Sequence, residues 1–238
     1  MDTSKKTIVV LSGAGVSAES GIKTFRDADG LWEGHDVMAV ASMGGWMKNR
    51  KLVLNFYNER RRQLKEVEPN TAHHIIADLE KDYNVIVVTQ NVDDLHERAG
   101  STQVVHLHGE LKKVRSVSNQ KVVMDWTEDC NIGDLCPDGT QLRPHIVWFG
   151  EAVPMLQTAA EVVSIADIII IVGTSLQVYP AAGLVGYALP GAKVYYVDPK
   201  PATNWELERT ANLKIIKEKA TVGMEEVAKE LRKNDNPS

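Results

Sequence analysis

His108 is the residue of this chain best suited to acid–base chemistry, because an imidazole titrates near neutral pH and can accept a proton under physiological conditions. Gly109 follows it and leaves room for a ligand. Gln90, Asn91 and Asp93 add two amides and an acid that could hold sugar hydroxyls and the amide of a ligand. The alternative for His108 is a buried structural histidine. The alternative for Gln90, Asn91 and Asp93 is an ordinary loop whose side chains cap backbone groups.

A glycine-rich turn near the start of the chain could hold phosphate groups. It follows Ile8-Val9-Val10-Leu11, a β-branched run typical of a strand buried on both faces. The run continues as Ser12-Gly13-Ala14-Gly15-Val16-Ser17-Ala18, a GxGxxA variant of the dinucleotide fingerprint. Gly13 and Gly15 permit a tight turn and close approach to a ligand, and a helix beginning at Ser17 would point its N–H groups at a pyrophosphate. The glycine pattern is weak evidence on its own, because glycine turns after buried strands are common. The acid that an ordinary Rossmann fold has soon after this helix is also missing.

The elements that must position these residues alternate between strands and helices. Strands of the main sheet are expected at residues 7–11, 84–89, 104–107, 145–149, 167–172, 193–197 and 213–216. Helices are expected at 51–65, 72–81, 155–165, 181–188 and 221–233. This alternation predicts an α/β fold with a doubly wound, mostly parallel, Rossmann-like sheet. Ligands bind beyond the carboxyl ends of such strands, where the glycine turn, Gln90, His108 and the turn Gly173-Thr174-Ser175 all fall.

The pattern divides the chain into three parts. Residues 1–29, 70–111 and 144–238 form the expected dinucleotide-binding domain, 30–69 a helical lid, and 112–143 a small inserted module that contains Cys130 and Cys136. The polar stretch 21–32 predicts a loop, which either folds over the dinucleotide or is a surface connection.

Composition narrows the class of protein. The 238 residues are 43% hydrophobic and 25% charged, as in ordinary globular proteins. The net charge of −5 argues against a nucleic-acid-binding surface, and no apolar run reaches the length of a membrane span. Two cysteines and an N-terminus without a signal-peptide pattern lead us to expect a cytoplasmic protein.

Five stretches together resemble the sirtuin family, the NAD-dependent protein lysine deacylases. They are GAGVSAESGIKTFRD (13–27), TQNVDDLH (89–96), HLHGE (106–110), VWFGE (147–151) and GTSL (173–176). They occur in the family's order and cover nearly the whole chain. The resemblance therefore implies NAD as cofactor and acylated lysine side chains of proteins as substrates.

The resemblance also implies roles for individual residues. His108 becomes the general base, Gln90 contacts the nicotinamide ribose, and Asn91 and Asp93 help to form the nicotinamide pocket. The other implied cofactor-binding residues are Gly13, Ala14, Gly15, Ser17, Thr24, Phe25, Arg26, Gly173, Thr174, Ser175, Asp198 and Ala220. The implied peptide-binding residues are Val147, Phe149 and Gly150, at an edge that an extended substrate could join as a strand.

The family's reaction transfers the acyl group to the ADP-ribose part of NAD. The acyl oxygen attacks C1′ of the nicotinamide ribose, nicotinamide leaves, and His108 deprotonates the ribose so that its oxygen attacks the acyl carbon. The products are free lysine, nicotinamide and O-acyl-ADP-ribose, and no metal takes part.

The pair Tyr57 and Arg60 indicates which acyl group the substrate lysine carries. They lie three positions apart on the expected helix 51–65 and so share a face, where a phenol and a guanidinium could bind one carboxylate. This resembles the tyrosine-x-x-arginine pair of the desuccinylase branch of sirtuins, and implies a desuccinylase or demalonylase that also removes acetyl groups. A solvated basic face is the alternative, because Arg61 and Arg62 follow directly.

Zinc is not expected in the inserted module. Most sirtuins have two cysteine pairs there, and structural zinc sites need four ligands. This chain has Cys130 and Cys136 alone, and residues 114–119 contain neither cysteine nor histidine. Asp129, Asp134 or His145 would have to complete a site.

Three other function classes remain open from the residues. A redox dehydrogenase would use the same glycine turn, a non-catalytic binder of NAD or ADP-ribose would not need His108, and a mono-ADP-ribosyltransferase would share the NAD site.

Overall fold

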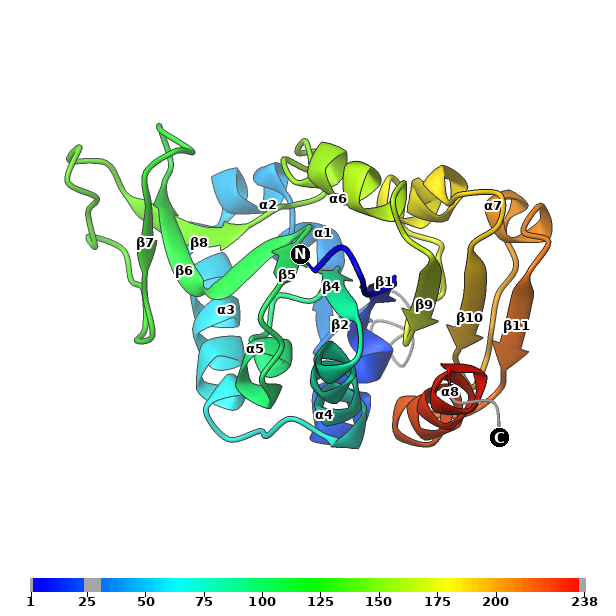
Figure 1. The fold of residues 1–238 in the computed structure, drawn as a ribbon. Helices are drawn as coiled ribbons and strands as arrows, with labels where there is room; N and C mark the ends of the chain where they lie inside the picture. The colour runs from blue at the N-terminus through cyan, green and yellow to red at the C-terminus, as the bar shows by residue number, and fades with distance from the viewer. Residues whose placement is uncertain (1, 24–30, 236–238) are drawn as a thin grey trace.

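A parallel six-stranded sheet forms the centre of the computed structural model, which describes residues 2–23 and 31–235 (Figure 1). Its strand order is β11-β10-β9-β1-β4-β5, and every pairing between neighbours is parallel. The strands are β1 (Thr7–Ser12), β4 (Asn84–Thr89), β5 (Val104–His106), β9 (Ile168–Val172), β10 (Lys193–Val197) and β11 (Leu213–Ile216). The predicted doubly wound α/β fold is thereby confirmed.

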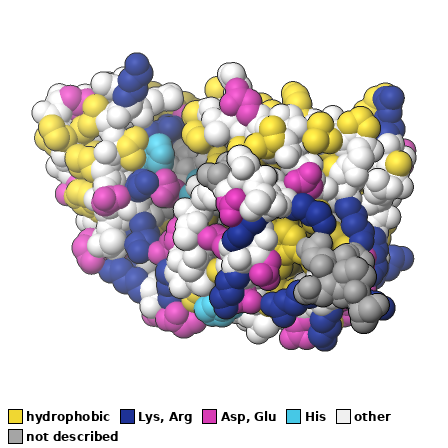
Figure 2. Space-filling model, viewed as in Figure 1, with side chains coloured by type: hydrophobic (Ala, Val, Ile, Leu, Met, Phe, Trp, Pro, Cys, Tyr) yellow, Lys and Arg dark blue, Asp and Glu magenta, His cyan; other side chains and the backbone are white. Residues whose placement is uncertain are grey.

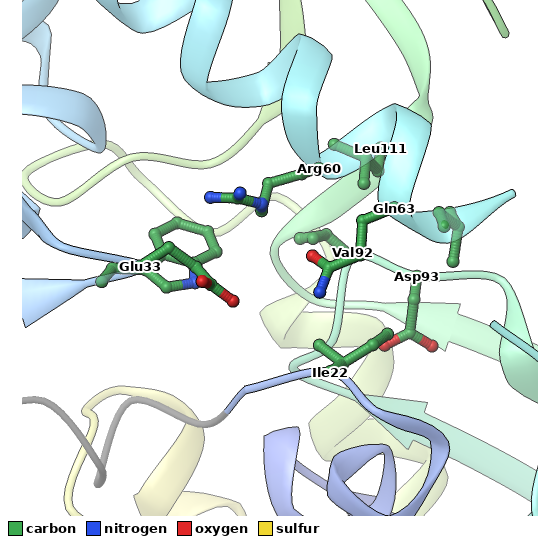
Figure 3. A pocket seen from close by; sticks show the side chains of 9 residues that line it. Ile22, Glu33, Arg60, Gln63, Val92, Asp93 and Leu111 are labelled. Carbon is green, nitrogen blue, oxygen red and sulfur yellow. The ribbon is translucent and has the colours of Figure 1, made fainter. Parts of the chain in front are cut away.

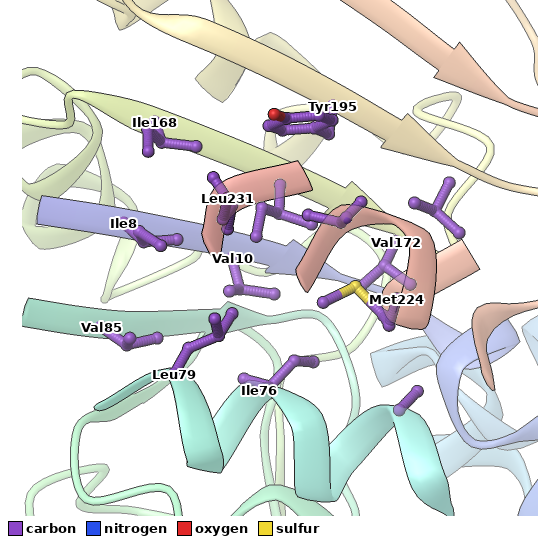
Figure 4. Packing of buried hydrophobic residues seen from close by; sticks show 14 of the residues in the cluster. Ile8, Val10, Ile76, Leu79, Val85, Ile168, Val172, Tyr195, Met224 and Leu231 are labelled. Carbon is purple, nitrogen blue, oxygen red and sulfur yellow. The ribbon is translucent and has the colours of Figure 1, made fainter. Parts of the chain in front are cut away.

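Helices cover both faces of this sheet. Because side chains alternate along a strand, Ile8 and Val10 of β1 face one layer while Val9 and Leu11 face the other. The first layer contains α4 (Thr71–Asp78) and α8 (Ala220–Asp235), whose Ile76 and Met224 pack against the sheet (Figure 4). The second layer contains α6 (Leu156–Val163), the 3₁₀ helix η5 (Ala181–Tyr187) and α7 (Trp205–Glu208).

A helical segment follows the residues 24–30, which lie outside the description. It consists of the hairpin β2 (Leu31–Trp32) and β3 (His35–Asp36), then α1 (Val37–Val40), α2 (Met43–Lys48) and α3 (Arg50–Leu64). Asn49 caps α3 and Asn70 caps α4, because each side chain accepts a hydrogen bond from a free backbone N–H of the first turn. The remaining short helices are α5 (Leu95–Ala99) and η4 (Leu79–Lys81).

A second, antiparallel sheet lies beside α3 and projects from the main body (Figure 1). Its order is β7-β6-β8, with β6 (Gly109–Ser116), β7 (Val123–Asp125) and β8 (Leu142–Ile146). The sheet therefore begins and ends a few residues outside the stretch 112–143 expected for the inserted module. That module boundary stays a prediction. The prediction that 145–149 return to the main sheet is wrong, because β8 pairs antiparallel with β6 instead.

The glycine turn does not lead into the α-helix expected at Ser17. Two single 3₁₀ turns follow β1 instead, η1 (Ala14–Val16) and η2 (Ala18–Ser20). Gly21 ends them in the left-handed conformation at φ 98°. The Ser17 hydroxyl bonds to residues of the β4 loop, so this segment is shaped by tertiary contacts more than by helix propensity.

Figure 2 shows one face of the molecule, where basic and acidic side chains are both spread over the surface. Within residues 2–23 and 31–235, no helix is long and apolar enough to cross a membrane.

Candidate functional site

Three loops at the carboxyl ends of β1, β4 and β9 are joined directly to one another. The backbone N–H of Gly15 donates to the Gly173 carbonyl at 2.8 Å, and that of Gln90 donates to the Ser12 carbonyl at 2.9 Å. The Gln90 amide also donates to the Thr174 hydroxyl at 3.0 Å. These bonds bring predicted residues from three parts of the sequence to one edge of the sheet.

The glycines of this edge are required by contact between the loops. A Cβ on Gly15 would lie 2.7 Å from the Gly173 Cα, and one on Gly13 would lie 2.7 Å from the Thr174 Cβ. Gly173 itself has φ +64°, and a Cβ there would lie 2.2 Å from a backbone nitrogen. Close approach of Gly13 and Gly15 to a ligand stays a prediction; in the structure, their lack of a Cβ permits close contact with the β9 loop.

His108 follows β5 and is held as a neutral imidazole. Its Nδ1 lies 3.1 Å from the Gln90 carbonyl, which can only accept, so Nδ1 carries the proton and Nε2 is the basic nitrogen. Burial lowers the pKa of His108, although the bond to Gln90 opposes that shift. At neutral pH this histidine is therefore ready to accept a proton at Nε2.

His106 has a different environment, although it lies only two positions away. Burial favours its neutral form, but the Glu97 carboxylate, 2.7 Å from Nε2, and the Asn91 carbonyl raise its pKa overall. Both of its ring nitrogens are thus bonded to protein atoms, which suits the structural role expected for it.

Asn91 and Asp93 lie together on the β4 loop around Ser17. The Ser17 hydroxyl donates to the Asp93 carboxylate at 3.1 Å and accepts from the Asn91 amide at 3.1 Å. Burial raises the pKa of Asp93 to about 6, against the hydrogen bonds from Leu95 and Ser17. The loop offers an amide and an acid side by side, a pair that fits a carboxamide group.

Two histidines that the sequence analysis left without a role lie behind this loop. His96 Nε2 is 2.9 Å from the Ser12 hydroxyl, and His73 Nε2 is 3.5 Å from that of Ser17. The two rings meet edge to face with centroids 4.9 Å apart, and burial lowers the pKa of both. The one sequence signal for His73 is its spacing from Ile76 on the buried face of α4.

The remaining predicted cofactor residues are distributed along the same edge. Ser175 follows Thr174 in the β9 loop, and Asp198 comes directly after β10, where its buried carboxylate accepts from the Lys200 N–H at 2.8 Å. Ala220 is the buried first residue of α8. Thr24, Phe25 and Arg26 lie outside the described residues.

Arg60 lines a cleft beside this loop (Figure 3). The lining residues are Ile22, Trp32, Glu33, Arg60, Gln63, Leu64, Val92, Asp93 and Leu111. The Nε and Nη1 atoms of Arg60 are buried with no hydrogen-bond partner among the described residues, whereas Nη2 lies 3.5 Å from Glu59. A buried guanidinium with two free donors is a ready site for an anion, because leaving such donors unmet is costly.

Tyr57 is not among the described residues that line this cleft. Its side chain is completely buried, and its hydroxyl oxygen accepts a hydrogen bond from Trp148 Nε1 at 3.0 Å. Burial raises the pKa of Tyr57, so the phenol keeps its proton and can still donate it. Tyr57 and Arg60 share a helix as predicted, and their joint role in binding a carboxylate stays a prediction.

Several backbone N–H groups of the segment 147–150 already donate hydrogen bonds within the protein, so this segment is not a fully open strand edge. The N–H of Val147 donates to the His108 carbonyl, and that of Phe149 donates to the Ala41 carbonyl, each at 2.9 Å. The Trp148 N–H donates to the Glu151 carboxylate at 2.8 Å. A peptide lying here would therefore pair mainly with carbonyl oxygens; Phe149 and Gly150 are exposed.

Cys130 and Cys136 are buried, free thiols in the apolar core beside α3. Burial raises the pKa of Cys130 to about 11, which disfavours the thiolate that a metal requires. In the parts of the chain that the structure covers, no three His, Cys, Asp or Glu side chains are grouped to hold a metal ion.

The fold and the strand-end loops define a dinucleotide-binding α/β protein. Residues 13–180 match the model of the Sir2 family. The chain is 59% identical over 226 residues to an NAD-dependent protein deacylase of Helicobacter pylori (strain ATCC 700392 / 26695), covering 95% of this chain and 97% of that one. The chain belongs to the Sir2 family, as its motifs indicated.

Solved structures agree with this assignment. A Sir2 homologue in complex with NAD superposes with a TM-score of 0.84 at 38% identity, covering 98% of this chain and 91% of that one. A mutant Sir2 homologue in complex with ADP-ribose gives a TM-score of 0.86 at 37% identity, covering 100% and 99%.

Proposed function

We propose that this chain is an NAD-dependent protein lysine deacylase in which His108 is the general base and Arg60 binds an acidic acyl group. The activity rests on the Sir2 family match and on the deacylase relatives. The hydrogen bond from His108 Nδ1 to the Gln90 carbonyl carries the assignment of the base, because in the neutral imidazole it puts the proton on Nδ1 and makes Nε2 the nitrogen that accepts. Bound NAD would supply the ADP-ribosyl group to which the acyl group is transferred.

Different residues of the site have different roles in this reaction. Asn91 and Asp93 offer an amide and a carboxyl group to the nicotinamide carboxamide, and Ser17 holds both in place. Gln90, whose side chain donates to Thr174 and whose carbonyl accepts from His108, would contact the nicotinamide ribose. His108 then removes a proton from a ribose hydroxyl, a step for which a buried, neutral imidazole is suited.

The acyl preference rests on the cleft beside these residues. Arg60 presents two buried donors without partners among the described residues, which an acetyl group would leave unmet and a succinyl or malonyl carboxylate would satisfy. Tyr57 lies three positions from Arg60, within one turn of the same helix, and can donate its phenolic proton. The enzyme therefore favours succinyl and malonyl groups and retains some deacetylase activity.

Incubation with NAD and matched succinyl-, malonyl- and acetyl-lysine peptides, followed by mass spectrometry, tests the proposal. The expected products are free lysine peptide, nicotinamide and O-acyl-ADP-ribose. An ADP-ribosylated peptide would indicate a mono-ADP-ribosyltransferase, a reduced cofactor a dehydrogenase, and unchanged NAD a non-catalytic binder.

The proposed activity, the net charge and the free cysteines indicate the partners and the compartment of the protein. The substrates are acylated proteins; the net charge of −5 gives no support for a nucleic-acid partner. Both cysteines are free thiols, as is usual in the reducing cytoplasm, where we place the enzyme.

A further inference from the structure

Glu33 contributes a carboxyl group, in addition to that of Asp93, to the cleft that Arg60 lines. It comes from the hairpin between β2 and β3, whereas Arg60 and Gln63 come from α3 on the other side (Figure 3). Its side chain is only 11% exposed. A cleft with a guanidinium on one wall and a carboxylate on another differs from a purely cationic acyl pocket.

The hairpin turn does not explain why residue 33 is a glutamate. Glu33 has φ 50° and Gly34 has φ 80°, so both central residues are left-handed, as a two-residue type I′ turn requires. Asparagine, aspartate or glycine is the usual residue at the first of these positions. A glutamate there is sterically disfavoured, and its carboxylate lines the cleft.

The only cation within ion-pair distance of Glu33 among the described residues is Lys23, and it is weakly placed to neutralise it. Lys23 Nζ lies 3.2 Å from Glu33 Oε2, but its side chain is 72% exposed. Solvent screens the exposed ammonium of Lys23, so this pair compensates the charge of the largely buried Glu33 carboxylate only in part. Part of the negative charge of Glu33 therefore still acts on a group that enters the cleft.

We propose that Glu33 sets the acyl selectivity of the enzyme by opposing the attraction of Arg60 for an acyl carboxylate. This inference rests on the proposed function. A succinyl carboxylate that reaches Arg60 enters a cleft already lined by the Glu33 carboxylate, and like charges repel across a partly desolvated gap. A neutral acyl end that accepts from Arg60 and donates to Glu33 avoids that repulsion. The wild-type cleft thus discriminates only weakly between an acid and its amide.

The test compares succinyl-lysine with its terminal carboxamide isostere on the same peptide. The two acyl groups have nearly the same shape, so the ratio of their kcat/KM values reports the charge effect and cancels changes in folding or NAD binding. The variants are Glu33→Gln, Lys23→Met and Arg60→Met, each measured at low and at high salt.

Glu33→Gln should raise the acid-to-amide ratio by roughly fivefold, the size of a partly screened like-charge repulsion. Lys23→Met should lower it by about twofold, because Glu33 then acts unopposed, and the double variant should behave as Glu33→Gln does. High salt should reduce these differences. A ratio that is unchanged or lowered in Glu33→Gln would overturn the inference.

Arg60→Met separates this inference from the proposed function. If Arg60 reads the carboxylate, its removal lowers the acid-to-amide ratio, whatever Glu33 does. A ratio unaffected by Arg60→Met would mean that the acyl assignment itself is wrong. A ratio lowered in Arg60→Met but not raised in Glu33→Gln would reject the role of Glu33 alone.

Discussion

The indole N–H of Trp148 donates a hydrogen bond to the phenolic oxygen of Tyr57 at 3.0 Å, and both side chains are almost completely buried. The bond joins α3, which carries Arg60, to the segment 147–150 expected to bind the substrate peptide. The Arg143 guanidinium lies 3.3 Å from the centre of the Trp148 ring and pairs with Glu151 at 2.8 Å. The orientation of Tyr57 therefore depends on the same side chains that hold the substrate segment.

Tyr57→Phe should destabilise the protein by about 1–3 kcal/mol, because it leaves a buried indole N–H without its acceptor. Trp148→Phe removes the donor instead, so the two substitutions should not be additive. Urea unfolding of both single variants and of the double variant gives the coupling free energy, expected to be about 1 kcal/mol. Additive losses would show that the hydrogen bond contributes nothing measurable to stability.

Arg60→Met should lower kcat/KM for succinyl-lysine by at least roughly tenfold, because hydrogen bonds to a charged group are worth about 1.5–3 kcal/mol. Deacetylation should change far less, since an acetyl group has no carboxylate. Arg62→Met is the matched control, because Arg62 pairs with Asp129 at the surface of the same helix. Equal losses on the two peptides would assign Arg60 to the fold or the NAD site.

His73 should make the protein less stable in mild acid. Burial lowers its pKa from 6.5 to about 4, so its contribution is fully present above pH 6.5 and is lost as the pH falls from 6.5 towards 4. The linked free energy is roughly 3 kcal/mol. His73→Gln should therefore show a shallower fall in unfolding free energy between pH 7 and pH 4.5.

The neighbouring His74 provides the control for this measurement, because it is exposed on the same helix. His74→Gln should keep most of the wild-type pH dependence, because burial is the main cause of the lowered pKa of His73 and the charge of His74 a lesser one. Identical pH profiles for His73→Gln and the wild type would show that His73 does not resist protonation in the folded state.

The small sheet should hold its shape without zinc. Its cysteines are buried among apolar side chains, and the Ser116 hydroxyl links β6 to Asp138 at 2.7 Å and Thr140 at 2.8 Å. Elemental analysis of protein prepared without chelator should find no bound zinc, and a chelator should leave the Tm unchanged. One zinc per chain, or a Tm lowered by the chelator, would contradict this expectation.

The sheet and its strand-end loops could be predicted because their signals are local. β1 and β4 each contain an unbroken apolar run, and the glycine turn and Gln90 follow these two strands directly, so topology brings them together. The partners of Tyr57 and His96 could not be predicted, because Trp148 is 91 positions from Tyr57 and Ser12 is 84 positions from His96. Tertiary contacts likewise replaced the helix expected at Ser17 with 3₁₀ turns.

Turnover by His108→Ala tests the central claim most directly. NAD binding, followed by calorimetry, should be largely retained, because the β1, β4 and β9 loops are held by bonds that do not involve the imidazole. Formation of O-succinyl-ADP-ribose from NAD and a succinyl-lysine peptide should fall by about 10²-fold or more, the usual contribution of a general base. Wild-type turnover in His108→Ala, with the same product, would contradict the assignment of His108 as the base.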